Sequence, residues 1–270
     1  MGAAIIAKVM GNVPCTIAIE ENKPEAIAHM REVVAKLGYK TIEVMELKMR
    51  YPQGSEKQLI DAVMHRQVRS GGLPISVGAV VQNVGTALAV YEAVQKNKPL
   101  IDNTITVTGK CFPTQVNLQV RIGTPFSYII DSLGGMPKEA AKVISGGPMM
   151  GKAVANLDAT TLKGTSALLF LTEQETRRAP ETACIRCGKC ADACPMGLEP
   201  LLLQKLSRIA DTEALEANAA QDCIECGCCL YSCPAHIPLL DIIRTGKGRA
   251  LGAIKARAAA AKAAAEAANK

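Results

Sequence analysis

The sequence predicts a mixed α/β chain that ends in a helical, cysteine-rich segment. Between residues 12 and 53, apolar runs that suit β-strands alternate with an amphipathic helix pattern. Beyond residue 99, two short runs alternate apolar and polar residues. Nine of the 11 cysteines lie between Cys184 and Cys233. At 270 residues with 49% hydrophobic residues, the chain can form two or three small domains, each with its own core.

The first 98 residues have the pattern of an α/β domain. Residues 15–19 and 42–47 are expected strands, and residues 23–37 are the expected helix between them, which ends at Gly38. This order predicts a βαβ unit. Two further helices are expected. One covers residues 55–66, with Ser55 as N-cap and Gln58 at the capping-box position, and the other runs from about residue 83 to residue 95.

Residues 99–175 predict a small β-grasp-like domain and connecting strands. Residues 104–108 and 118–122 alternate as strands do, and residues 124–133 suit a helix. The glycine-rich stretch 144–151 lacks the G-x-G-x-x-G spacing of a dinucleotide fingerprint. It is therefore predicted to be a turn between strands, with a contact surface for a partner or cofactor as the alternative.

The clustered cysteines form two matching runs, both C-x-x-C-x-x-C-x-x-x-C-P. Bacterial-type ferredoxins bind [4Fe–4S] clusters with this spacing, and the fourth cysteine of each run ligates the cluster of the other run. Structural zinc is the alternative, but zinc needs four ligands per site and has no use for a matched double run. The sequence therefore predicts two [4Fe–4S] clusters, one held by Cys184, Cys187, Cys190 and Cys233, the other by Cys223, Cys226, Cys229 and Cys194.

The residues around these runs predict an α-helical ferredoxin domain over residues 176–243. Apolar residues between 197 and 222 recur at helical spacing, so the segment between the runs is expected to be helical. We expect Pro195 and Pro234 to start the helices that follow each run. Gly188 and Gly227 stand where a side chain would crowd a sulfur or where a positive φ is required.

One cysteine and one histidine of this region have two interpretations each. Cys228 has no counterpart in the first run, where Lys189 takes its place, so it is expected to be a thiol that is not a ligand. A ligand exchange or redox role is the alternative. His236 follows Cys233 by three residues and is either a surface residue or a hydrogen-bonding neighbour of a cluster.

The net charge of +6 is concentrated in a basic, Ala-rich tail over residues 244–270. This tail is predicted to be helical without a wide apolar face. The tail is either a solvated extension, or it contacts anionic lipid headgroups or an acidic partner. Its charged residues are Arg244, Lys247, Arg249, Lys255, Arg257, Lys262 and Lys270, against Glu266.

Composition also excludes some function classes. Aromatic residues make up 3% of the chain and tryptophan is absent, which argues against nucleic-acid recognition by base stacking. The sequence contains no run of about 18 apolar residues, so it does not predict a membrane span. The N-terminus does not have the pattern of a signal peptide.

Several segments together resemble the C subunit of the bacterial Rnf electron transport complex. Besides the cysteine runs, they are IEENKPEAI at 19–27, YPQGSEKQL at 51–59, VVQNVGT at 80–86 and GGPMMG at 146–151. The resemblance implies a partial Rossmann-like, flavin-type domain over residues 1–98 and an SLBB (soluble-ligand-binding β-grasp) domain over residues 99–175. The helical ferredoxin domain over residues 176–243 and the tail over residues 244–270 would follow.

The resemblance also implies a function and a location. The protein would lie on the cytoplasmic face of the bacterial inner membrane, as a peripheral part of an ion-translocating NADH:ferredoxin-type oxidoreductase. Its electrons would pass between NADH or ferredoxin, FMN, the two clusters and the other Rnf subunits. The alternatives are an iron–sulfur subunit of a soluble dehydrogenase or hydrogenase, and a scaffold with structural clusters.

The sequence departs from the family pattern at its start. The family's flavin-cradling G-G-x-G-F-P loop is not found, so the chain resembles an N-terminally truncated member and is not expected to oxidise NADH by itself. Asn83 and Thr86 match a turn that meets flavin in the related subunit of respiratory complex I. The alternative is that Asn83 only caps the helix that follows it.

Overall fold

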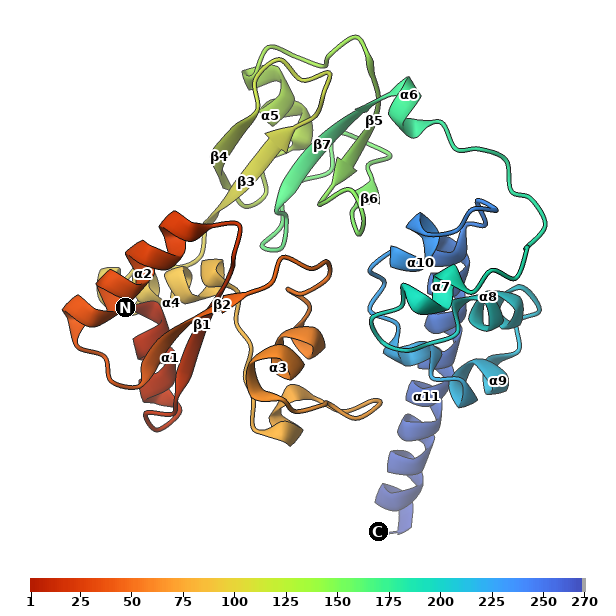
Figure 1. The fold of residues 1–270 in the computed structure, drawn as a ribbon, viewed down its shortest axis with the longest axis horizontal. Helices are drawn as coiled ribbons and strands as arrows, with labels where there is room; N and C mark the ends of the chain where they lie inside the picture. Colours follow the sequence, from red (N-terminus) through yellow and green to blue (C-terminus); the bar gives the residue numbers. More distant parts are fainter. Residues whose placement is uncertain (269–270) are drawn as a thin grey trace. The chain divides into compact units, whose positions relative to one another are not determined.

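The structure, a computed structural model, describes residues 1–268 in two compact units. The first unit comprises residues 1–147 and 151–173, and the second comprises residues 148–150 and 174 onward. Figure 1 gives the order of the elements along the chain. Residues 269 and 270, the end of the expected tail, lie outside the described residues.

The predicted βαβ unit is present near the N-terminus. Strands β1 (Cys15–Glu20) and β2 (Ile42–Leu47) pair in parallel, and helix α2 (Pro24–Leu37) connects them (Figure 1). A proline opens α2 where its missing N–H costs nothing, and Gly38 ends the helix at a φ of 67°. Ile27 anchors α2, because it is only 4% exposed.

Four more helical elements complete this part of the chain. They are α1 (Gly2–Val9), α3 (Glu56–Met64), a 3₁₀ turn (Pro74–Val77) and α4 (Val84–Lys96). Helix α3 begins after Ser55 as predicted, but the Ser55 side chain makes no capping hydrogen bond. Helix α4 begins after Asn83, whose side-chain oxygen accepts a hydrogen bond from the Gly85 amide at 2.8 Å.

Residues 102–172 form a five-stranded mixed sheet in the order β4-β3-β7-β5-β6. Its strands are β3 (Asp102–Thr108), β4 (Val116–Arg121), β5 (Ala140–Ser145), β6 (Lys152–Ala153) and β7 (Ala167–Thr172). The two predicted strands are present as β3 and β4, which pair antiparallel, and the glycine-rich stretch is the connection between β5 and β6, as predicted. The sequence does not predict the central position of β7, which is parallel to β3 and antiparallel to β5.

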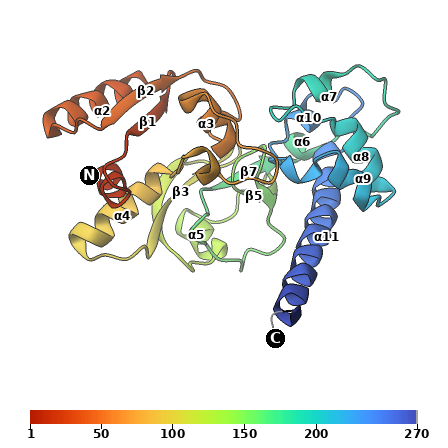
Figure 2. The ribbon, with the colours of Figure 1, turned by 90° about the horizontal axis from the view of Figure 1, so that it is seen from below.

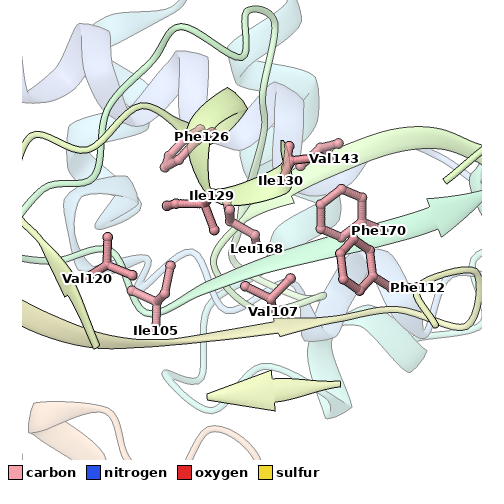
Figure 3. Packing of buried hydrophobic residues seen from close by; sticks show 10 residues of the cluster. All are labelled: Ile105, Val107, Phe112, Val120, Phe126, Ile129, Ile130, Val143, Leu168 and Phe170. Atoms are coloured by element: carbon pink, nitrogen blue, oxygen red, sulfur yellow. The ribbon is translucent and has the colours of Figure 1, made fainter. Parts of the chain in front are cut away.

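The core of this sheet lies between β3, β7, β5 and helix α5 (Phe126–Ser132), as Figure 3 shows. Leu168 and Phe170 of β7 are completely buried, and the rings of Phe170 and Phe112 lie 4.6 Å apart between centroids. Burying one such side chain stabilises a fold by about 1.5–3 kcal/mol. The short helix α6 (Glu173–Thr176) follows β7, and the first unit ends at its first residue, Glu173.

The second unit consists of helices. They are α7 (Lys189–Asp192), α8 (Pro200–Arg208), α9 (Thr212–Ala217), a 3₁₀ turn (Ala220–Asp222), α10 (Cys228–Tyr231) and α11 (Leu239–Ala268). Helices α8 and α9 pack against α11 around fully buried leucines and alanines, among them Leu203, Leu215 and Ala250. The helical segment expected between the two cysteine runs is therefore present.

The structure corrects the expected starts of the helices after the cysteine runs. Helices α8 and α11 begin at Pro200 and Leu239, whereas Pro195 and Pro234 lie in turns. Two residues after each proline, Gly197 and His236 have φ angles of 63° and 53°. An α-helix cannot include a left-handed residue, so the chain turns there first.

Helix α11 continues across the expected start of the tail at residue 244 without a break. Its first part belongs to the core of the second unit, because Ile243 and Ala250 are buried against α8 and α9. Figure 2 shows its C-terminal half extending beyond α8 and α9. Within residues 1–268, no helix combines the length and the apolar character that crossing a membrane requires.

Candidate functional site

The two cysteine runs adopt the same backbone conformation. Arg186 and Glu225, which precede the second cysteine of their runs, have φ angles of 55° and 58°. Gly188 and Gly227, which follow that cysteine, have φ angles of 78° and 83°. These are left-handed values that favour glycine, so the conformational role expected of both glycines is observed. The third cysteine of each run then lies in a one-turn helix, Cys190 in α7 and Cys229 in α10.

One cysteine-lined cavity combines three cysteines of the first run with the last cysteine of the second. The cavity has a volume of about 390 Å³. Apolar residues that include Ile185, Leu201 and Ile237 form much of its remaining wall. Its cysteines are Cys184, Cys187, Cys190 and Cys233.

A second, tighter cavity combines three cysteines of the second run with the last cysteine of the first. Its volume is about 20 Å³, and Leu203, Leu240 and Ile243 line it together with the cysteines. Its cysteines are Cys194, Cys223, Cys226 and Cys229. Each cavity thus draws three thiols from one run and one from the other.

The two sets differ strongly in exposure. Cys184 and Cys187 are exposed, whereas Cys226 and Cys229 are 8% and 9% exposed. No group of three or more His, Cys, Asp or Glu side chains in residues 1–268 is arranged to hold a single metal ion. The four thiols of each set instead surround a space, and an all-thiolate donor set suits an iron–sulfur cluster. The donor set of each cavity therefore has the chemistry that an iron–sulfur cluster requires.

Burial controls the protonation of these thiols. It raises the pKa of Cys190 and of Cys223, and it raises the pKa of Cys229 to about 12, with the neighbouring thiols Cys223 and Cys226 adding to the effect. Without metal, these thiols are protonated at neutral pH. Ligation requires thiolates, so cluster binding must release their protons.

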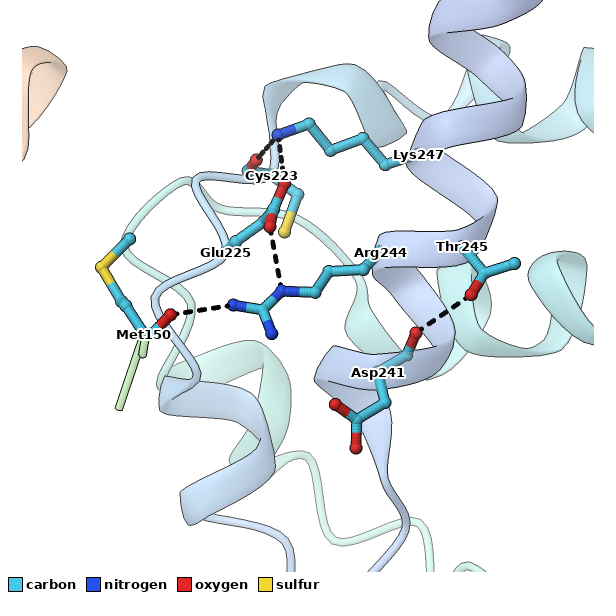
Figure 4. A network of polar contacts seen from close by, with 7 residues as sticks. All are labelled: Met150, Cys223, Glu225, Asp241, Arg244, Thr245 and Lys247. Carbon is cyan, nitrogen blue, oxygen red and sulfur yellow. Dashed lines mark hydrogen bonds and ion pairs between the residues drawn. The ribbon is translucent and has the colours of Figure 1, made fainter. Parts of the chain in front are cut away.

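A charged network joins the second cysteine run to α11 (Figure 4). Lys247 Nζ donates to the Cys223 carbonyl oxygen at 2.7 Å and to Glu225 Oε1 at 2.9 Å. Arg244 Nε donates to Glu225 Oε2 at 2.9 Å, and another guanidinium nitrogen donates to the Met150 carbonyl oxygen at 3.3 Å. Burial opposes ionisation of Glu225, but Lys247 and Arg244 outweigh it and hold the pKa of this carboxyl below its ordinary value.

The sequence pattern does not reveal this network. It places Arg244 and Lys247 in a basic tail, whereas in the structure both side chains bind the loop beside Cys223. Arg257, farther along α11, forms an ion pair with Glu216 of α9. One feature of the sequence could have pointed to the network: the second run has the acidic Glu225 where the first run has the basic Arg186.

The remaining candidate residues lie outside both cavities. Cys228 is half-buried and does not line either cavity. Burial and then a hydrogen bond with Cys226 raise its pKa to about 11. His236 is exposed and does not line the first cavity, although Ala235 and Ile237 on either side of it do.

The turn that resembles a flavin-contacting segment lies at the start of α4. The Asn83 side-chain oxygen caps α4, which is the alternative interpretation of this residue, and Thr86 is exposed.

Three family models match the chain. The Nuo51 FMN-binding domain matches residues 1–92, the SLBB domain matches residues 104–153, and the 4Fe-4S dicluster domain matches residues 177–246. Together with the two cysteine-lined cavities, they define the class: an iron–sulfur protein in which a 4Fe-4S dicluster domain follows flavoprotein-type α/β and SLBB domains.

The chain is also similar to curated proteins. The chain is 46% identical over 207 residues to the C subunit of the proton-translocating ferredoxin:NAD(+) oxidoreductase complex of Clostridium ljungdahlii, an alignment that covers 77% of this chain and 45% of the relative. It is 42% identical over 247 residues to the C subunit of the Na(+)-translocating ferredoxin:NAD(+) oxidoreductase complex of Acetobacterium woodii, which covers 92% of this chain and 55% of the relative.

A third relative, the C subunit of the ion-translocating oxidoreductase complex of Rhodobacter capsulatus, is 41% identical over 248 residues, or 92% of this chain and 48% of the relative. The chain is thus a homologue of the Rnf-type C subunit, and the resemblance found in the sequence is confirmed. It spans about half the length of the curated relatives it matches.

Proposed function

We propose that this chain holds two [4Fe–4S] clusters with crossed ligation and transfers single electrons through them. Cys184, Cys187, Cys190 and Cys233 would hold the first cluster, and Cys223, Cys226, Cys229 and Cys194 the second. The observation that carries this proposal is the composition of the two cavities, each of which is lined by one of these two sets and by no other cysteine.

The chain's own residues perform three tasks in this proposal. The cysteines supply thiolates after losing the protons that burial favours. Apolar side chains such as Leu203 and Ile243 exclude water from the second cavity. The network around Glu225 ties the second cysteine run to α11. When bound, the clusters supply one-electron redox chemistry.

We propose further that the chain works within a membrane-associated, ion-translocating ferredoxin:NAD⁺ oxidoreductase complex of the Rnf type. The names of its relatives support this assignment, because two of them carry "ferredoxin:NAD(+) oxidoreductase" and all three are the C subunit of a translocating complex. The other subunits are then its partners, with ferredoxin and NAD(H) as the redox pair. The protein would attach peripherally to the cytoplasmic side of the inner membrane.

Iron content after anaerobic reconstitution of the full chain tests the cluster assignment. About eight irons per chain are expected, four for each cluster. A chain that binds no iron would refute the proposal. Cys228→Ser is the matched control, because this cysteine lies beside the second site without lining its cavity, and it should retain about eight irons.

Double variants test the crossing. Cys194→Ser should leave about four irons, and Cys194→Ser combined with Cys223→Ser should leave the same number, because both residues belong to one site. Cys194→Ser combined with Cys184→Ser should bind almost no iron, since each change removes a ligand from a different site. The reverse pattern for the two double variants would show that each run binds its own cluster.

A further inference from the structure

The two cysteine runs and the helices that follow them form an internal repeat. Every position of the first has a counterpart 39 residues later, so that Cys184 corresponds to Cys223 and Arg208 to Lys247. The repeats diverge at charged positions beside the cysteines. Where the second repeat has Glu225, Arg244 and Lys247, the first has Arg186, Lys205 and Arg208.

In the second repeat these residues fix a positive charge against a ligand-bearing loop. Glu225 accepts hydrogen bonds from both cations, and Lys247 also donates to the backbone carbonyl of Cys223 at 2.7 Å (Figure 4). Two cations against one carboxylate leave one net positive charge. The side chains of Lys247 and Arg244 are only 18% and 25% exposed, so water screens this charge weakly.

The first repeat cannot form the same arrangement. Its loop carries the cation Arg186 in place of a carboxylate, so nothing there can hold the basic residues of α8 against the loop. Arg208, the counterpart of Lys247, instead forms a 2.6 Å ion pair with Glu181. Among the described residues, neither Arg186 nor Lys205 has an ion-pair partner, and both are exposed, where solvent and salt screen their charge.

A fixed, weakly screened positive charge favours the addition of an electron nearby. Reduction potentials of iron–sulfur clusters depend on net charge, on hydrogen bonds and on solvent exposure around the ligands. All three differ between the two sites: the Cys223 loop is half-buried where the Cys184 loop is exposed, it is hydrogen-bonded through the Cys223 carbonyl, and it is held beside a net positive charge.

We propose that Lys247 is a positioning residue that sets the reduction potential of the site formed by Cys194, Cys223, Cys226 and Cys229. Glu225 holds the Lys247 ammonium against the Cys223 carbonyl, and the ammonium charge raises the potential of this site alone. The first site, which lacks the arrangement, does not depend on Lys247. This inference rests on the proposed function, because it requires both sites to hold clusters.

The test is a redox titration of the reconstituted full chain, followed by the electron paramagnetic resonance signals of the reduced clusters. Lys247→Gln removes the charge and keeps a hydrogen-bond donor, while Lys247→Arg keeps the charge. Lys262→Gln is the matched control, because it removes a lysine from the exposed part of the same helix, where 80% of the side chain is exposed.

One of the two midpoint potentials should become more negative in Lys247→Gln, and the other should stay unchanged. A tenfold loss in the reduction equilibrium corresponds to about 59 mV for a one-electron couple. Lys247→Arg and Lys262→Gln should leave both potentials at their wild-type values. If both midpoints stay unchanged in Lys247→Gln, or both shift equally, the proposal is wrong.

Cluster loading separates this inference from the proposed function. A wild-type chain that binds no iron defeats the proposed function before any titration. If the wild-type chain is fully loaded and Lys247→Gln has the same midpoint potentials, only this inference is wrong. Should Lys247→Gln fail to load, Lys247→Met provides the neutral variant, and the single-site shift is again the required result. Loss of loading in both neutral variants but not in Lys247→Arg would show a purely structural role and overturn the proposal.

Discussion

Gly246 of α11 lies so close to Ser207 of α8 that a Cβ atom at Gly246 would be 2.0 Å from the Ser207 hydroxyl oxygen. That hydroxyl is buried and donates to the Leu203 carbonyl oxygen at 2.7 Å. The neighbouring Arg249 donates to the Ser207 carbonyl oxygen at 3.0 Å. The two helices that follow the cysteine runs therefore meet at a contact that only glycine permits.

Gly246→Ala should destabilise the second unit by about 1–3 kcal/mol, because the added methyl group forces the two helices apart. Gly248→Ala is the matched control on the same helix, since a Cβ atom at Gly248 would have no neighbouring atom within 4 Å. It should stabilise the helix by about 0.5–1 kcal/mol through its better helix propensity. Urea denaturation followed by circular dichroism measures both, and equal effects of the two changes would contradict the close contact.

Phe170→Ala should destabilise the five-stranded sheet by about 3–5 kcal/mol, because it leaves a cavity between β7 and α5. The side chain is fully buried and contacts the ring of Phe112. Tyr128→Ala, in α5 but 68% exposed, should change stability by less than about 0.5 kcal/mol. Calorimetry of the full chain would measure the unfolding transition of the unit that contains the sheet. A mild effect of Phe170→Ala would mean that β7 is not the central strand.

The exposure of the two cysteine sets predicts an order of thiol modification in the metal-free chain. Cys184 and Cys187 are exposed and should react first with iodoacetamide. Cys229 should react most slowly, because it is 9% exposed and its pKa is raised to about 12 by burial. Mass spectrometry of peptides at successive times gives the order. The denatured chain, in which the cysteines should react alike, is the control.

Asp102 should make the stability of the first unit depend on pH. A hydrogen bond from Gln119 and then one from Lys98 lower the pKa of Asp102. A carboxyl whose folded-state pKa is lowered stabilises the fold above its unfolded pKa, and this contribution is lost as the pH falls through the folded value. The difference in melting temperature between wild type and Asp102→Asn should therefore be constant near neutral pH and shrink in acid.

The control for this pH dependence is Asp131→Asn, which changes an exposed aspartate of α5 in the same unit. Its melting temperature is compared with that of wild type over the same pH range. A difference between wild type and Asp102→Asn that does not respond to acid would show that the hydrogen bonds at Asp102 contribute nothing to stability.

The sequence by itself determined the local elements, and it predicted the pattern of ligands. The βαβ unit over residues 15–47 follows from its apolar periodicity and from Gly38, which must end the helix, and both features act within a few residues. The cysteine spacing predicted two crossed sets of four, because the fourth cysteine of each run leaves its own loop. In the structure, each set lines a cavity of its own.

Only the tertiary structure decided which distant segments meet. Strand β7 lies between β3 and β5 because its apolar residues fill the centre of the sheet, and no local pattern specifies that position. Arg244 and Lys247 have the pattern of a basic tail, since a sequence shows the sign of a charge but not its partner. The fold places them against Glu225 and the Cys223 carbonyl, where burial reduces the screening by water. The two cysteine sites have the same cysteine spacing, and they differ because the charged residues beside the cysteines differ and only those of the second site are packed together.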